Sequence, residues 1–268
     1  QWSIMTDPIR GGSGNYHSGS HLAMSNDGNI IWVSTCGILK QCSNRGTKRL
    51  IYNDGQWTGS IQSTGIVIRI NRDSTLQATA VPPSEGLKIN DVSNNANFGT
   101  GFKYKLSELC PPESTGSNCW DMQQLRSFEI SNDEDGVTLI AAAPNQDFTF
   151  DPSRGRGFVL IWEWTWDEIN ESVELTGRWP SKEADFIEGR NDGDLNGISI
   201  ALNGNGDVMA IASSRYDGNN ENSGKVRVFE KTLNGWVQLG QDLLGEGDEY
   251  DQFGQSIDLD DSGTTIAI

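Results

Sequence analysis

The segment Leu195-Asn-Gly-Ile-Ser-Ile-Ala-Leu-Asn-Gly-Asn-Gly-Asp-Val-Met-Ala-Ile-Ala212 consists of two short apolar runs joined by a turn rich in Asn and Gly. After a polar loop, Gly224-Lys-Val-Arg-Val-Phe-Glu230 and Trp236-Val-Gln-Leu-Gly240 form a second pair around Asn234-Gly235. Alternating or β-branched runs bounded by Gly, Asn and Asp are typical of antiparallel strands and hairpins. The stretch therefore predicts one unit of four antiparallel strands.

This unit recurs along the chain, and the distance from Trp179 to Trp236 is one full repeat. In each copy a tryptophan precedes a glycine at a nearly constant spacing, and a second glycine follows the first at a constant spacing. The three copies are marked by Trp2, Gly19 and Gly28, by Trp179, Gly197 and Gly206, and by Trp236, Gly254 and Gly263. A repeat that contains four short strands is characteristic of the blades of a β-propeller.

The sequence thus predicts an all-β chain that forms a β-propeller of four-stranded antiparallel blades. About three blades are complete and a fourth begins, with limits at about residues 2–75, 76–178, 179–235 and 236–268. The stretches 36–64 and 82–122 are interpreted as insertions that provide contact surfaces. Because the fourth copy stops within a strand, and propellers usually have four to eight blades, we expect a larger ring formed by a longer protein.

The composition is strongly acidic, with 37 Asp and Glu against 20 Lys and Arg and a net charge of −17. Nucleic acids and anionic membrane surfaces would repel such a chain, so neither is an expected partner. No apolar run approaches the length that a membrane-spanning helix needs, and we expect no membrane insertion in this segment.

Four cysteines and one glycosylation motif indicate an oxidising compartment. The cysteines allow three pairings, of which the local one joins Cys36 to Cys42 and Cys110 to Cys119. A zinc site is the rival interpretation, but the spacings differ from those of paired Cys-x-x-Cys motifs. The sequence favours disulfides and, with the acceptor motif at Asn170, a secreted or cell-surface glycoprotein.

Several short motifs resemble those of a known repeat family. Phe253-Gly254 is similar to the Phe-Gly of FG-GAP repeats, Ala142-Ala-Pro144 to their Gly-Ala-Pro, and Gly224-Lys-Val-Arg-Val-Phe229 to their third strand. The chain therefore resembles the FG-GAP-like propellers of secreted proteins from diatoms, related algae and marine bacteria, and more remotely the integrin α-subunit propeller. The resemblance implies a propeller used for adhesion, assembly or recognition outside the cell.

The long calcium-binding loop of integrin-type blades has no match here, because turns such as Asp260-Asp-Ser-Gly263 are too short to surround a cation. Acidic residues at matching places in two consecutive units are the remaining calcium candidates. These are Asp192, Asp194, Asp248 and Asp251. No other cofactor is expected.

No catalytic motif is recognisable in the sequence. We therefore expect a structural or adhesive module whose partners are other extracellular proteins, further copies of itself, or glycans. The alternatives are a lectin-like propeller and a sialidase-like glycoside hydrolase. A glycosidase needs two facing carboxylates, and sequence alone cannot identify such a pair among 37 acidic side chains.

Overall fold

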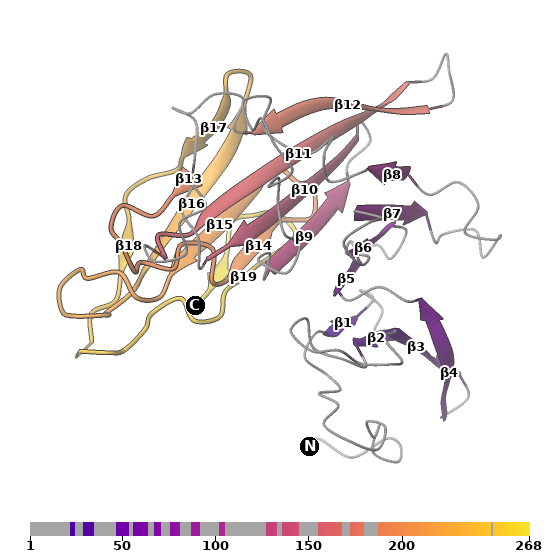
Figure 1. Ribbon diagram of the computed structural model, residues 1–268, viewed down its shortest axis with the longest axis horizontal. Helices are drawn as coiled ribbons and strands as arrows, with labels where there is room; N and C mark the ends of the chain where they lie inside the picture. The colour runs from indigo at the N-terminus through magenta and orange to yellow at the C-terminus, as the bar shows by residue number, and fades with distance from the viewer. Residues whose placement is uncertain are drawn as a thin grey trace. The chain divides into compact units, whose positions relative to one another are not determined.

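The computed structural model is built of strands and turns in its described residues (Figure 1). These residues are 22–24, 29–34, 47–53, 56–63, 67–70, 76–80, 87–91, 102–104, 127–132, 136–144, 155–167, 172–179, 187–247 and 249–268. The chain divides into two compact units, Gln1–Gln123 and Gln124–Ile268.

The N-terminal unit contains two four-stranded antiparallel sheets whose strands follow one another in sequence order. The first sheet consists of β1 (Leu22–Met24), β2 (Ile30–Ser34), β3 (Thr47–Asn53) and β4 (Gln56–Ser63). The second sheet consists of β5 (Val67–Ile70), β6 (Leu76–Ala80), β7 (Leu87–Asp91) and β8 (Phe102–Tyr104).

The C-terminal unit contains two more sheets of the same kind and the start of another. The third sheet consists of β9 (Ser127–Asn132), β10 (Gly136–Ala143), β11 (Phe158–Asp167) and β12 (Ser172–Trp179), with β13 (Ile187–Glu188) paired to β11. The fourth sheet consists of β14 (Ile200–Leu202), β15 (Val208–Ser213), β16 (Lys225–Thr232) and β17 (Gly235–Gln238), with β18 (Leu243–Leu244) paired to β16. A two-stranded sheet of β19 (Asp258–Leu259) and β20 (Ile266–Ala267) follows.

Within each unit, the first strands of consecutive sheets lie against one another. β1 contacts β5, β9 contacts β14, and β14 contacts β19. Consecutive up-and-down sheets that meet through their first strands are the blades of a β-propeller. The structure therefore confirms the predicted all-β propeller. Its described residues form two four-stranded and two five-stranded sheets, where the sequence predicted about three complete blades.

The sheets divide the chain differently from the blade limits expected from sequence. β3 and β4, which complete the first sheet, lie in the stretch interpreted as an insertion. β5 and β6, which were expected in different blades, pair with each other. The physical reason lies in the outer strand β4, where Gln56, Thr58 and Gly59 are exposed. An outer strand with a solvated surface lacks the apolar pattern by which strands are recognised in a sequence.

A repeated glycine lies at a close contact between the third and fourth sheets. Gly197 has a φ of 87°, and a Cβ at this position would lie 2.6 Å from the Cβ of Ala142. Gly254 has a φ of 88°, and its Cβ would lie 2.9 Å from the Cβ of Ala212. In successive copies, the two glycines thus permit the same close contact between one sheet and the preceding sheet.

Apolar side chains fill the spaces on both faces of the fourth sheet. One core lies between the third and fourth sheets and contains Ile140, Ala142, Val159, Ile161, Ile187, Ile200, Leu202, Met209, Ile211 and Phe229. The other lies between the fourth sheet and β19 and contains Ala201, Ala210, Ala212, Val226, Ile257 and Leu259.

The repeated tryptophans are not equivalent in register. Trp179 ends β12 opposite Ile161, whereas Trp236 lies in β17 opposite Lys231. Trp179 lies in β12 and Trp236 in β17, each the fourth strand of its sheet, whereas the sequence placed each tryptophan at the start of a blade. A repeat period fixes the spacing of the copies but not the point where one sheet ends.

We predict that Gly197→Ala destabilises the chain more than Gly193→Ala. Both glycines have positive φ, which costs an alanine about 1–2 kcal/mol. At Gly193 nothing lies within 4 Å of the added Cβ, whereas at Gly197 overlap with Ala142 costs a further 1–3 kcal/mol, roughly. Urea unfolding of both variants measures the difference, and equal losses of stability would contradict the close approach of the sheets.

Candidate functional site

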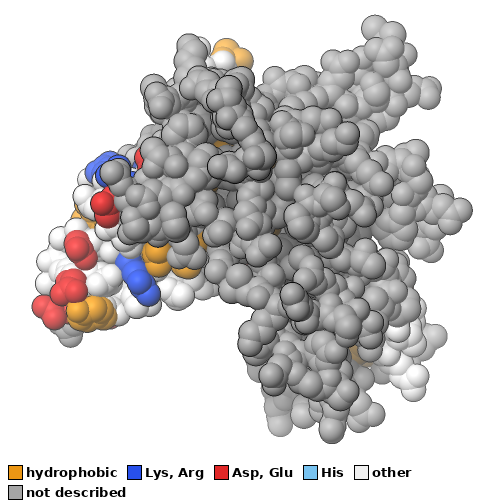
Figure 2. Space-filling model, viewed as in Figure 1, with side chains coloured by type: hydrophobic (Ala, Val, Ile, Leu, Met, Phe, Trp, Pro, Cys, Tyr) orange, Lys and Arg blue, Asp and Glu red, His pale blue; other side chains and the backbone are white. Residues whose placement is uncertain are grey.

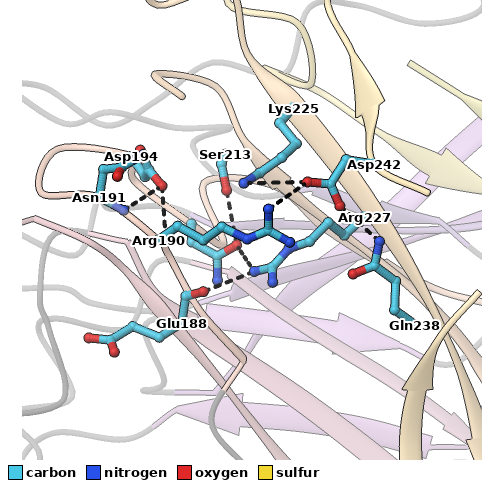
Figure 3. A network of polar contacts seen from close by, with 10 residues as sticks. Glu188, Arg190, Asn191, Asp194, Ser213, Lys225, Arg227, Gln238 and Asp242 are labelled. Carbon is cyan, nitrogen blue, oxygen red and sulfur yellow. Dashed lines mark hydrogen bonds and ion pairs between the residues drawn. The ribbon is translucent and has the colours of Figure 1, made fainter. Parts of the chain in front are cut away.

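A polar network lies between the third and fourth sheets, where apolar packing would be expected (Figure 3). Lys225 and Arg227 alternate along β16, so they point to the same face as Phe229. Phe229 belongs to the core shared with β10 and β11. The two cations are therefore directed toward the third sheet, and both are buried.

Asn196 is the centre of the hydrogen bonds in this network. Its Oδ1 accepts from Ser213 Oγ at 3.0 Å and from Arg227 Nη2 at 2.9 Å. Its Nδ2 donates to the backbone carbonyl of Ile187 at 2.9 Å. Arg227 Nη2 also donates to the carbonyl of Glu188 at 3.0 Å. Because β13 is paired to β11, these bonds tie the fourth sheet to the third.

Asp242 is the carboxylate nearest to the cations. Gln238 Nε2 donates to its Oδ1 at 2.8 Å, while Arg190 Nη1 and Lys225 Nζ lie 3.5 Å and 3.9 Å from its Oδ2. The second carboxylate, Asp194, is buried, and its Oδ2 accepts the backbone N–H groups of Arg190 and Asn191. Asp194 thus shapes the loop that carries Arg190.

Burial dominates the electrostatics of the two β16 cations. Burial, together with the nearby charge of Arg227, lowers the pKa of Lys225 to about 8, although Asp242 opposes the shift. Burial also lowers the pKa of Arg227. The Lys225 Nζ lies 3.5 Å from the centroid of the Tyr216 ring, whose face attracts a cation.

The calcium candidates take different positions in the structure. Asp192 accepts a hydrogen bond from Arg156 Nε at 2.6 Å, and Asp194 lies in the network. Asp251 is exposed, and Asp248 lies outside the described residues. Across the described part of the chain, no three His, Cys, Asp or Glu side chains are grouped to hold a metal. Calcium binding in these loops stays a prediction.

Other residues singled out from sequence also lie outside the described residues. They are Trp2, Gly19, Gly28, Cys36, Cys42, Cys110, Cys119 and Asn170. The predictions of disulfides and of glycosylation are accordingly untested.

The sequence analysis did not identify Lys225 and Arg227 as candidate site residues, although comparison of the repeats could have done so. Gly157 and Gly224 both have positive φ, and a Cβ on either would overlap the backbone of the residue before a repeat glycine. The strands that follow them therefore correspond, Phe158 to Lys225 and Leu160 to Arg227. Two apolar positions of the third sheet are cations in the fourth.

No protein-family model matches this chain, and no curated protein matches it either. Among solved structures, hydrazine synthase from Kuenenia stuttgartiensis is similar with a TM-score of 0.50 at 14% identity, over 91% of this chain and 66% of that one. A functionally unknown protein from Desulfotomaculum acetoxidans has a TM-score of 0.49 at 12% identity, over 92% and 61%. The Myceliophteria thermophila Cps50 (Swd1) β-propeller domain has a TM-score of 0.36 at 12% identity, over 93% and 78%.

These similarities concern the fold alone. The chain spans 61% of the length of the Desulfotomaculum protein and 66% of the length of hydrazine synthase. In the part of the chain that the structure describes, no helix has the length and apolar character required to cross a membrane.

We predict that the stability of the chain rises with pH between 8 and 10.5 through Lys225. The pKa of this ammonium is about 8 in the folded chain and 10.5 for an ordinary lysine, so only the unfolded chain retains the proton in this window. Folding in this window releases the proton, and the cost of that release falls as the pH rises, so stability increases by up to about 1.4 kcal/mol per pH unit.

Urea unfolding of the wild type and of Lys225→Met across this range isolates the effect from that of other titrating groups. The difference in unfolding free energy between the two proteins should change in favour of the wild type as the pH rises. Parallel curves would show that Lys225 carries no perturbed charge.

Proposed function

We propose that this chain is an extracellular, non-catalytic propeller module that mediates protein assembly. The observation that supports the proposal is an exposed apolar strip on the outer part of the fourth sheet, formed by Val237 in β17, Leu239 just after it and Leu243 in β18. Their side chains are 52%, 50% and 37% exposed. Contiguous apolar surface on a soluble protein is typical of a contact site for another protein.

The strip continues an existing core. Leu239 N–H donates to the carbonyl of Val228, and Leu243 pairs with Val226 across β16 and β18. Val226 and Val228 contribute to the core against β19. Cross-strand neighbours share a face of a sheet, so the strip lies on the same face as that core. β19 and β20 cover the inner part of this face. The outer strip is exposed in the 268-residue chain, and it is also the place where further strands of the β19–β20 sheet would pack in the larger ring expected from sequence.

The surroundings of the strip suit a protein contact. Figure 2 shows hydrophobic and charged side chains intermixed on the described surface of this unit. Glu230, which pairs with Val237, is exposed beside it. An apolar centre with a charged margin is the usual composition of a protein interface. The even number of cysteines supports an extracellular location, because disulfides persist in oxidising compartments.

We expect the 268-residue chain to self-associate through this strip. Sedimentation velocity over a concentration series should show reversible association of the wild type. The double variant Val237→Glu/Leu239→Glu should be monomeric, because two charges cannot be buried unpaired in an apolar contact.

Leu233→Glu is the matched control. Leu233 is fully exposed between β16 and β17, outside the strip, so its substitution should leave association unchanged. A wild type that sediments as a monomer at every concentration, or a double variant that associates like the wild type, would contradict the proposal.

A further inference from the structure

The network between the third and fourth sheets has an excess of positive charge. Arg190, Lys225 and Arg227 are three cations, and the carboxylates in contact with them or their loop are Asp194 and Asp242. The carboxylate of Glu188 is directed away from the cations in Figure 3. Among the described residues of the network, one positive charge is therefore left uncompensated, although the net charge of the chain is −17.

Two buried donors in this network have no hydrogen-bond partner among the described residues. They are Lys225 Nζ and Arg227 Nε, on side chains that are 0% and 7% exposed. Buried donors in native proteins are almost always paired with protein atoms, water or a ligand. Lys225 Nζ is 3.9 Å from Asp242 Oδ2 and lies over the Tyr216 ring, contacts that leave its hydrogen-bonding capacity unused. Both donors can therefore bind a molecule that presents acceptor atoms.

The fold does not require cations at these positions. The third sheet forms the same strand with Phe158 and Leu160, which are 0% and 3% exposed. The polar change also extends beyond β16, because Asn196 occupies the place that Phe253 takes in the next copy. Asn196 hydrogen-bonds Arg227, so the substitutions form one connected set.

We propose that this cluster is a binding site for the carboxylate group of a small ligand, held by Lys225 Nζ and Arg227 Nε with Arg190 at its entrance. A carboxylate has the single negative charge that balances the excess, and its two oxygens match an ammonium and a guanidinium donor. The Arg190 side chain is 58% exposed, which connects the cluster to solvent. The site lies on the opposite face of β16 from the outer strip and is independent of it.

Titration of the full chain with sodium acetate at pH 7 tests the site. Isothermal calorimetry should give saturable binding with a millimolar dissociation constant, the order expected for a ligand of four heavy atoms. The melting temperature should rise with acetate above its value in sodium chloride of equal ionic strength. No binding heat and no rise over chloride would overturn the proposal.

Lys225→Phe/Arg227→Leu restores the apolar pair of the third sheet and should abolish acetate binding. Arg190→Gln, at an exposed position, should weaken binding by roughly tenfold and decides the question if the double variant does not fold. Lys231→Gln removes a cation that pairs with Glu163 outside the cluster, and binding should be unchanged. Acetate binding by the double variant or by Arg190→Gln with wild-type affinity would place the ligand elsewhere and overturn the assignment.

Discussion

The close contact of one sheet with the next at a glycine is the constraint on which the structure of the C-terminal unit depends. Gly197 precedes β14, and Gly254 precedes β19. A Cβ on either glycine would overlap an alanine methyl group of the preceding sheet. Only a residue without a side chain, in a backbone conformation of positive φ, permits that approach. The apolar cores described on the two faces of the fourth sheet follow from it, since the facing sheets must be near enough for their side chains to interdigitate.

The same geometry explains how a polar network can exist between two blades. Where the third sheet has Phe158, the fourth has Lys225, and the backbone around the two positions is alike. The glycine contacts and the apolar core hold the sheets together, so a few positions are available for charged side chains. Asn196 then orients Arg227 by a hydrogen bond and ties it to the adjacent sheet. The repeated positions thus stabilise the packing of the sheets, and the positions that depart from the repeat form the polar network.

The sequence predicted the all-β propeller correctly because strand and turn patterns are local properties of the chain. Gly197 and Gly254 occupy the same place in consecutive copies, and their φ angles are nearly identical. The tryptophan spacing was less informative, because Trp179 and Trp236 face different partners in their sheets. β4 was missed since its exposed residues have no apolar pattern. Comparison of the repeats could have marked Lys225 and Arg227 as cations at positions that are apolar in the preceding copy. Their contacts with Asn196 and Asp242 could not be predicted, because only the packing of the sheets brings these segments together.

Nuclear Overhauser effects between glycine Hα protons and alanine methyl groups test the central claim most directly. In a sample labelled at alanine methyls, we predict strong cross-peaks from Gly197 to Ala142 and from Gly254 to Ala212. Cross-peaks that connect each glycine only to methyl groups of its own sheet would contradict the glycine-mediated packing of successive blades.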